Sequence, residues 1–125
     1  MFYFFSETIP PNTSKKNYKR RWIDTEEPCL EAVYVQIPPG VCGLAGFRVR
    51  AREFNIFPRP EWEFFTGDNV ALIFNINYFF EHPKTRVFID FYNEDELYPH
   101  TIFIGLLFGS GVSVGRITPF VWEVW

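Results

Sequence analysis

The stretch Phe47-Arg48-Val49-Arg50-Ala51-Arg52 decides the fold class. Apolar and charged residues alternate through it without a break, and successive side chains of a β-strand point to opposite faces of the sheet. One face of this segment is therefore apolar, and the other carries three arginines. A helix would scatter both groups around its axis, so the sequence predicts a strand here.

Further strands are expected on either side of this stretch. Residues 29–37 are rich in β-branched side chains and end at the turn signal Pro38-Pro39-Gly40, so we expect a hairpin with residues 43–52. More strands are expected at residues 54–57, 70–77, 86–92, 101–108 and 120–125, with turn residues between them. No window of about 12 residues shows the apolar repeat of a helix. The sequence therefore predicts an all-β fold, an antiparallel β-sandwich of the jelly-roll or immunoglobulin-like type.

Aromatic residues are unusually frequent: the 125 residues include 16 Phe, 6 Tyr and 4 Trp. They occur on both faces of the expected strands. Phe88, Phe103 and Leu107 fall on faces opposite to an apolar face that already suits the core. A small monomer cannot bury two apolar faces, so this surplus predicts a surface that contacts another subunit.

The first 28 residues differ from the rest of this single-domain chain. Prolines at 10 and 11 interrupt any regular element, and five positive charges follow within seven residues: Lys15, Lys16, Lys19, Arg20 and Arg21. We expect an extended arm at residues 1–28 and a sandwich at residues 29–125. If the arm is exchanged between subunits, Phe2, Phe4 and Phe5 would anchor it on the neighbouring subunit. Its basic run would then lie on the acidic C-terminal half of that neighbour. The alternative is that the arm folds back onto its own sandwich.

Charge and hydropathy limit the partners. The net charge of −3 makes nucleic acid an unlikely main partner, although phosphate binding by the basic run stays open. The start of the chain lacks the basic residues and the long apolar run of a secretory signal. The apolar run near residues 101–108 is far shorter than the roughly 20 residues of a spanning helix. We expect a protein without membrane contact.

No residue pattern names a chemistry, so we expect neither an enzyme nor a cofactor. His82 and His100 lie beside prolines in apparent turns, as exposed loop histidines often do. Glu61 and Glu63 share the spacing of one strand face and leave a glycosidase open as a weaker alternative. The acidic residues 93–96 are expected to form a solvated turn, with calcium binding as the alternative.

A carbohydrate-binding sandwich that mediates surface attachment is the alternative function. Trp62 and Tyr78 are the candidate platforms for sugar rings, and Asn75, Asn77 and Asp68 are polar residues that could accompany them. Cys29 and Cys42 would lie at different distances from the expected turn, so we expect two buried free thiols rather than a disulfide.

The chain resembles a group of small β-sandwich proteins encoded in bacteriophage genomes. Four stretches carry the resemblance, within residues 9–104: Ile9-Pro10-Pro11-Asn12-Thr13, Ile37-Pro38-Pro39-Gly40 with Gly43-Leu44-Ala45-Gly46, Phe65-Thr66-Gly67-Asp68, and Tyr92-Asn93-Glu94-Asp95 running into Tyr98-Pro99-His100-Thr101. They are turn and strand-edge signatures. The resemblance implies a virion or assembly role such as capsid decoration, in a homo-oligomer or with a capsid protein, and it brings no catalytic residues. We therefore expect the protein in the virion if it is phage-encoded and otherwise in the cytoplasm.

Overall fold

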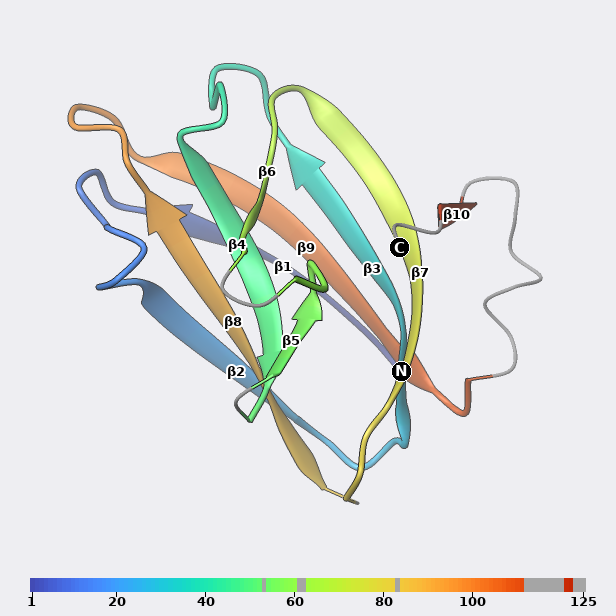
Figure 1. The fold of residues 1–125 in the computed structure, drawn as a ribbon. Helices are drawn as coiled ribbons and strands as arrows, with labels where there is room; N and C mark the ends of the chain where they lie inside the picture. Colours follow the sequence, from blue (N-terminus) through green and yellow to red (C-terminus); the bar gives the residue numbers. More distant parts are fainter. Residues whose placement is uncertain (53, 61–62, 83, 112–120, 123–125) are drawn as a thin grey trace.

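The computed structural model describes residues 1–52, 54–60, 63–82, 84–111 and 121–122, and the regular structure in this part of the chain consists of β-strands alone. Two sheets pack face to face as a β-sandwich (Figure 1). The all-β sandwich predicted from alternation is confirmed. The strands are β1 (Phe2–Ile9), β2 (Lys19–Thr25), β3 (Cys29–Ile37), β4 (Ala45–Ala51), β5 (Phe54–Phe57), β6 (Phe65–Thr66), β7 (Val70–Phe79), β8 (Thr85–Asn93), β9 (His100–Gly109) and β10 (Val121–Trp122).

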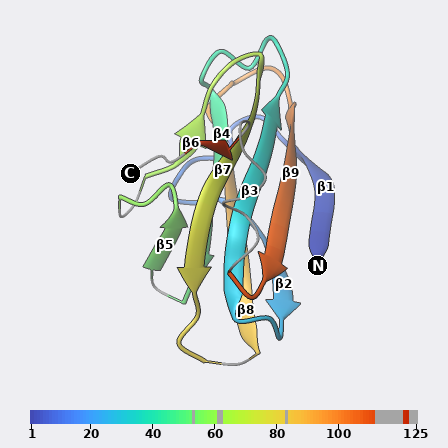
Figure 2. The same ribbon diagram turned by 90° about the vertical axis from the view of Figure 1, so that its right-hand side faces the viewer.

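The strand order differs from the chain order in both sheets. Sheet A has the order β1-β9-β3-β7-β10, and Figure 2 shows β7, β3, β9 and β1 following one another across it. Sheet B has the order β2-β8-β4-β5, and β6 pairs with β4 off this path. The pairings are antiparallel except that β10 lies parallel to β7. The chain changes sheet at every connection from β1 to β4 and again from β6 to β9.

The core lies between the sheets and is built from the strand faces that alternation predicted. Phe47, Val49 and Ala51 of β4 are at most 6% exposed. From the other sheet, β9 contributes Ile102, Ile104, Leu106 and Phe108, each at most 1% exposed. Aromatic rings close the gap between the layers: Phe57 of β5 and Phe74 of β7 have ring centroids 4.8 Å apart.

The first 28 residues do not form the expected arm. All eight residues of β1 pair with β9, from Phe2 opposite Leu107 to Ile9 opposite His100, and β2 pairs with β8. Alternation explains this, because every second residue of β1 faces the core and Ile9 is fully buried. The prolines that suggested an arm carry the chain from sheet A to sheet B. The fold-back alternative therefore describes this structure, and both expected segments share one core.

The expected hairpin between residues 29–37 and 43–52 is also wrong. β3 lies between β9 and β7 in sheet A, and β4 lies between β8 and β5 in sheet B. The connection after Pro38 therefore crosses between the layers. Both cysteines are free as predicted, but only Cys29 is buried, whereas Cys42 is exposed in the crossing loop.

Candidate functional site

A row of charged side chains crosses the outer face of sheet B. Arg20 of β2, Asp90 of β8 and Arg48 of β4 are register partners on adjacent strands. Asp90 is fully buried and accepts hydrogen bonds from Arg20 Nε and Nη2 at 2.7 and 3.1 Å and from Arg48 Nε at 2.9 Å. A buried carboxylate needs such partners, since burying an unpaired charge is costly. The hydrogen bond to Asp90 raises the pKa of Arg20, which stays cationic.

Aromatic rings also contact the guanidinium groups of Arg20 and Arg48. Arg48 lies 4.4 Å from the ring centroid of Phe64 and 5.0 Å from that of Tyr18. Arg20 lies 5.0 Å from the Tyr18 ring and 4.4 Å from the Phe88 ring. These distances are within the range of cation–π attraction. Phe88, expected on a second apolar face, therefore lies under an arginine on sheet B.

An open groove of about 500 Å³ lies over this row. Six of the eight described residues that line it are basic, and none of the eight is acidic; they are Lys15, Lys16, Tyr18, Arg20, Arg48, Arg50, Arg52 and Phe64. The lysines come from the loop between β1 and β2, and the last three arginines come from β4 and its end. We call this site the cationic groove. Folding thus places part of the basic run of residues 15–21 beside the arginines of the strand that decided the fold class.

Two members of the basic run lie elsewhere. Lys19 Nζ is 2.8 Å from Glu7 Oε2, and Arg21 Nη1 is 3.3 Å from Glu7 Oε1. These ion pairs join the edge strands β1 and β2 of the two sheets. Lys19 and Arg21 therefore form ion pairs within their own chain.

The outer face of sheet A is aromatic. We define the aromatic face by Phe2 and Phe4 of β1, Tyr34 of β3, and Phe103 and Leu107 of β9. The ring of Phe4 lies 6.3 Å from that of Phe2, 5.7 Å from that of Tyr34 and 6.5 Å from that of Phe103. Phe2 and Phe4 are 55% and 54% exposed. Four residues predicted as interface, namely Phe2, Phe4, Phe103 and Leu107, are therefore gathered on one surface.

The third expected anchor, Phe5, points the other way. It packs against the core, and the guanidinium of Arg21 lies 4.3 Å from its ring centroid. Alternation along β1 explains the difference, because Phe5 falls on the face opposite to Phe4. Phe5 is therefore partly buried against the core and does not belong to the aromatic face.

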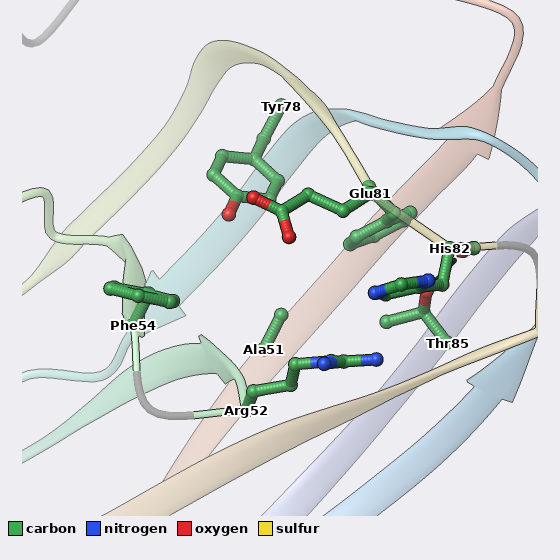
Figure 3. A pocket seen from close by; sticks show the side chains of 8 residues that line it. Ala51, Arg52, Phe54, Tyr78, Glu81, His82 and Thr85 are labelled. Atoms are coloured by element: carbon green, nitrogen blue, oxygen red, sulfur yellow. Dashed lines mark hydrogen bonds between the residues drawn. The ribbon is translucent and has the colours of Figure 1, made fainter.

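The proposed sugar platforms are only partly described. Trp62 lies outside the described residues, as does Glu61. Tyr78 lines a pocket of about 20 Å³ with Phe54, Glu81 and His82, shown in Figure 3, and that volume suits water rather than a sugar ring. Tyr78 also borders a hollow of about 340 Å³ with Asn55, Ile56, Arg59, Ile76 and Asn77.

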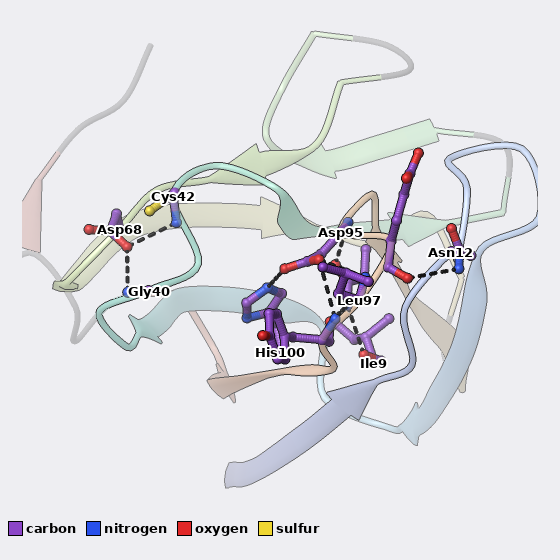
Figure 4. Close-up of polar contacts among 11 residues, drawn as sticks. Ile9, Asn12, Gly40, Cys42, Asp68, Asp95, Leu97 and His100 are labelled. Carbon is purple, nitrogen blue, oxygen red and sulfur yellow. Dashed lines mark hydrogen bonds and ion pairs between the residues drawn. The ribbon is translucent and has the colours of Figure 1, made fainter.

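The acidic loop at residues 93–96 is organised by its own hydrogen bonds (Figure 4). Asp95 Oδ1 accepts the backbone N–H groups of Leu97 and Tyr98 at 2.9 and 3.2 Å, and its Oδ2 lies 2.9 Å from His100 Nε2. The Leu97 N–H and then the His100 ring lower the pKa of Asp95 from its ordinary value. Asp68 braces the loop of residues 38–44 in the same way, through Gly40 and Cys42. These carboxylates act as turn braces, and the described residues contain no cluster of three or more His, Cys, Asp or Glu that suits a metal.

The sequence reasoning missed the partners of the basic run. The arginines at 48, 50 and 52 were visible as one face of a strand, but nothing local showed that Lys15 and Lys16 would lie beside them. Phe64, which packs on Arg48, gave no pattern of its own. Asp90 was the residue from which the site could have been inferred. It is a single acidic residue among aromatic residues on an expected strand, and such a residue needs a basic partner if it is buried.

None of the described residues belongs to a helix that is long and apolar enough to cross a membrane. Comparison of the chain with protein-family models, curated proteins and solved structures found no match. The function is therefore argued from the two outer faces of the sandwich.

Proposed function

We propose that the chain is a non-enzymatic assembly subunit of the kind that builds or decorates a phage virion, and that its sandwich is a jelly roll. The strand order supports the jelly-roll type: β1-β9-β3-β7 and β2-β8-β4-β5 are two four-stranded layers between which the chain alternates. Eight strands in two interleaved Greek keys define this fold, which serves in viral capsids and in lectins. The same fold serves many functions, so the function has to be inferred from the outer faces of the two sheets.

The exposed aromatic face carries the assembly proposal. Phe2 and Phe4 stay more than half exposed although rings of this size bury about 150–250 Å² each when covered. A contiguous apolar surface of this kind marks an interaction site in a soluble protein. Phe2 is also held in place, because a Cβ at Gly105 would lie 2.6 Å from its ring. The rings are thus presented on a rigid sheet rather than on a loop.

A second copy of this chain is the occupant that fits this face. In a two-fold contact the same surface meets itself, so a charge near the axis would face its own copy, and a charge elsewhere would be buried unless the patch also held its partner. The solvent-exposed residues on the outer side of β1, β3, β7 and β9 are uncharged, and they include Ser6, Thr8, Gln36 and Ala71. The one carboxylate there, Glu31, is 3% exposed and accepts the N–H of Gly111 at 2.6 Å. The cationic groove lies on the opposite layer and is not needed for this contact.

A pair of matched variants tests the proposal. Phe4→Asp puts a charge at the centre of the aromatic face, where a two-fold contact would bury it among apolar side chains. Leu97→Asp makes the same kind of change at a residue that is 75% exposed in the loop after β8. By light scattering on a sizing column, Phe4→Asp should reduce the oligomer to the 14.8 kDa chain, and Leu97→Asp should keep the wild-type mass. Equal masses for all three proteins would overturn the proposal.

Sugar binding is the second candidate, and one observation favours it. Asn77 Oδ1 is buried beside Tyr78 and has no hydrogen-bond partner among the described residues. A sugar hydroxyl could supply a donor there while the Tyr78 ring contacts the sugar face. Calorimetric titration with a panel of oligosaccharides would show saturable binding that Tyr78→Ala abolishes. No heat of binding with any sugar would remove this candidate.

A further inference from the structure

We propose that the outer edge of β1 pairs antiparallel with β1 of a second copy and joins the two copies of sheet A into one continuous sheet. Among the described residues, β1 has β9 as its single strand partner, and Figure 2 shows β1 at the edge of the sheet. An edge strand presents a row of unpaired N–H and C=O groups to any strand that can reach it. This contact runs through the backbone of one edge, so it is distinct from the face-to-face contact proposed above and does not depend on it.

The register of β1 fixes which of its backbone groups point away from β9. The carbonyl of Met1 accepts the N–H of Phe108 at 2.8 Å, and the register then continues along all of β1 without a shift. Hydrogen-bonded and non-hydrogen-bonded pairs alternate along an antiparallel ladder. The backbone N–H and C=O groups that point to the outer edge therefore belong to every second residue, namely Phe2, Phe4, Ser6 and Thr8.

The other edges of the two sheets are protected against such pairing, and β1 is not. β2 carries four charged residues among its seven, β5 has only four residues, and β10 lies beside β7. Charge and short length are devices that keep edge strands from pairing. β1 has eight residues, and its one charged side chain, Glu7, is 14% exposed and paired with Lys19 and Arg21. The inward-facing Tyr3 and Phe5 remain partly exposed at this open edge.

A second copy of β1 is the partner that fits, because the edge is self-complementary. Lys19 Nζ already donates to the Thr8 carbonyl at 3.3 Å, so the pairing is confined to residues 2–6. A two-fold axis at Phe4 then sets Phe4 opposite its own copy and Phe2 opposite Ser6. Each opposed pair exchanges two backbone hydrogen bonds, which gives about six in all. The opposed side chains are uncharged, so the repulsion that like charges cause in cross-strand pairs is avoided.

The charged cluster nearest this edge does not oppose the register. Glu7 and its copy would lie on opposite sides of the axis, about 20 Å apart along the strands. The Debye length is about 8–10 Å at physiological salt, so the two clusters of Glu7, Lys19 and Arg21 would be screened from one another.

Edge pairing also merges two aromatic faces into one surface, because both copies present the same side of the continuous sheet. The two-fold axis of the edge contact is perpendicular to the sheet, whereas the axis of a face-to-face contact lies parallel to it. The two contacts are therefore compatible, and together they close as a dihedral tetramer. The edge contact thus gives an assembly subunit a second way to bind its own copies.

Replacing Ser6 with Pro tests the pairing, because Ser6→Pro removes the Ser6 N–H and keeps every aromatic side chain. That N–H points away from β9, and Pro is tolerated in an edge strand at such a position. Thr8→Pro is the matched control, since it makes the same change just beyond the paired residues. By light scattering on a sizing column, Ser6→Pro should halve the mass of the wild-type assembly, and Thr8→Pro should keep it. Equal masses for the two variants would overturn the proposal, as would a wild type of one chain, which would leave the edge to a strand of another protein.

The mass that remains separates the edge contact from the face-to-face contact. If Ser6→Pro leaves pairs of chains, both contacts form in the wild type; if it leaves single chains, edge pairing stands and the face-to-face contact does not.

Hydrogen exchange of the wild-type assembly tests the same pairing without a substitution. The N–H groups of Phe4 and Ser6 donate to the second copy, whereas that of Thr8 stays in water. The protection factors of Phe4 and Ser6 should therefore exceed that of Thr8 by at least about tenfold. Equal protection of the three N–H groups would overturn the proposal.

Discussion

Replacing Asp90 with Asn removes one negative charge from the middle of the Arg20–Asp90–Arg48 row and keeps the shape of the side chain. The change puts an N–H group where a carboxylate oxygen accepted a guanidinium hydrogen bond. Arg20 can regain water, because its side chain is 35% exposed. Arg48 cannot, because its side chain is only 5% exposed and stays in the sheet with its charge.

The expected cost follows from that buried charge. Breaking a buried ion pair by removing one partner destabilises a protein by about 3–5 kcal/mol. The lower value applies here, because Arg20 is partly solvated and Asn retains one acceptor. The entropy of unfolding is about 2.1 cal/mol/K per residue, so about 3 kcal/mol in 125 residues lowers the melting temperature by about 10 °C.

The assay is thermal unfolding followed by circular dichroism, with Asp24→Asn as the control. Asp24 accepts from Arg86 Nε and Nη2 at 2.8 and 3.1 Å, on the same pair of strands and with nearly the same geometry as Asp90 and Arg20. Its side chain is 62% exposed and that of Arg86 is 52% exposed, so water replaces the lost interaction and the melting temperature should stay close to the wild-type value. Equal shifts for the two variants would refute the argument that burial makes the Asp90 row stabilising.

Two further predictions concern the crossing loop and the packing of β4. Cys42 is exposed and should react with a thiol reagent in the native protein at neutral pH. Cys29 should react only after unfolding, because it is buried and burial raises its pKa to about 11. Rapid reaction of both cysteines in the native protein would contradict this prediction. Gly46→Ala should destabilise the protein by at least about 1–3 kcal/mol, because its Cβ would lie 2.3 Å from the Phe65 carbonyl oxygen. Gly67→Ala, whose nearest neighbour would be a side-chain carbon at 3.3 Å, should unfold in urea close to the wild type, and equal unfolding midpoints for the two variants would count against the packing argument.

Alternation in the sequence was enough to find most of the strands and their faces. The expected segment at residues 54–57 coincides with β5, and the apolar sets of β4 and β9 are the buried ones. Alternation is a local property, and it reports which face of a strand is apolar because that face must be buried. It is silent about which strands pair, so the expected hairpin between β3 and β4 was wrong.

The first 28 residues show the same limit. A basic run after two prolines reads locally as an arm, since five adjacent charges would be costly to bury without partners. The partners are Glu7 for Lys19 and Arg21, and Asp90 for Arg20, which is 70 positions away. Such pairs are visible only once the strands are paired. The cationic groove was missed for the same reason, because Lys15 and Arg48 meet only through the sheet.

The two outer faces give the chain two separate surfaces. The surplus of aromatic residues led us to expect an apolar surface beyond the core, and the structure places Phe2, Phe4, Phe103 and Leu107 together on one layer. The other layer carries the cationic groove. The two outer layers therefore differ in chemistry, since one exposes aromatic rings and the other lines a groove with basic side chains.

Sedimentation equilibrium of the wild-type chain over a wide range of concentrations tests the central claim most directly. Self-association through the aromatic face predicts a mass above that of the 14.8 kDa chain, rising with concentration toward a defined multiple. A constant mass of one chain at every concentration would contradict the claim that this face binds a second copy.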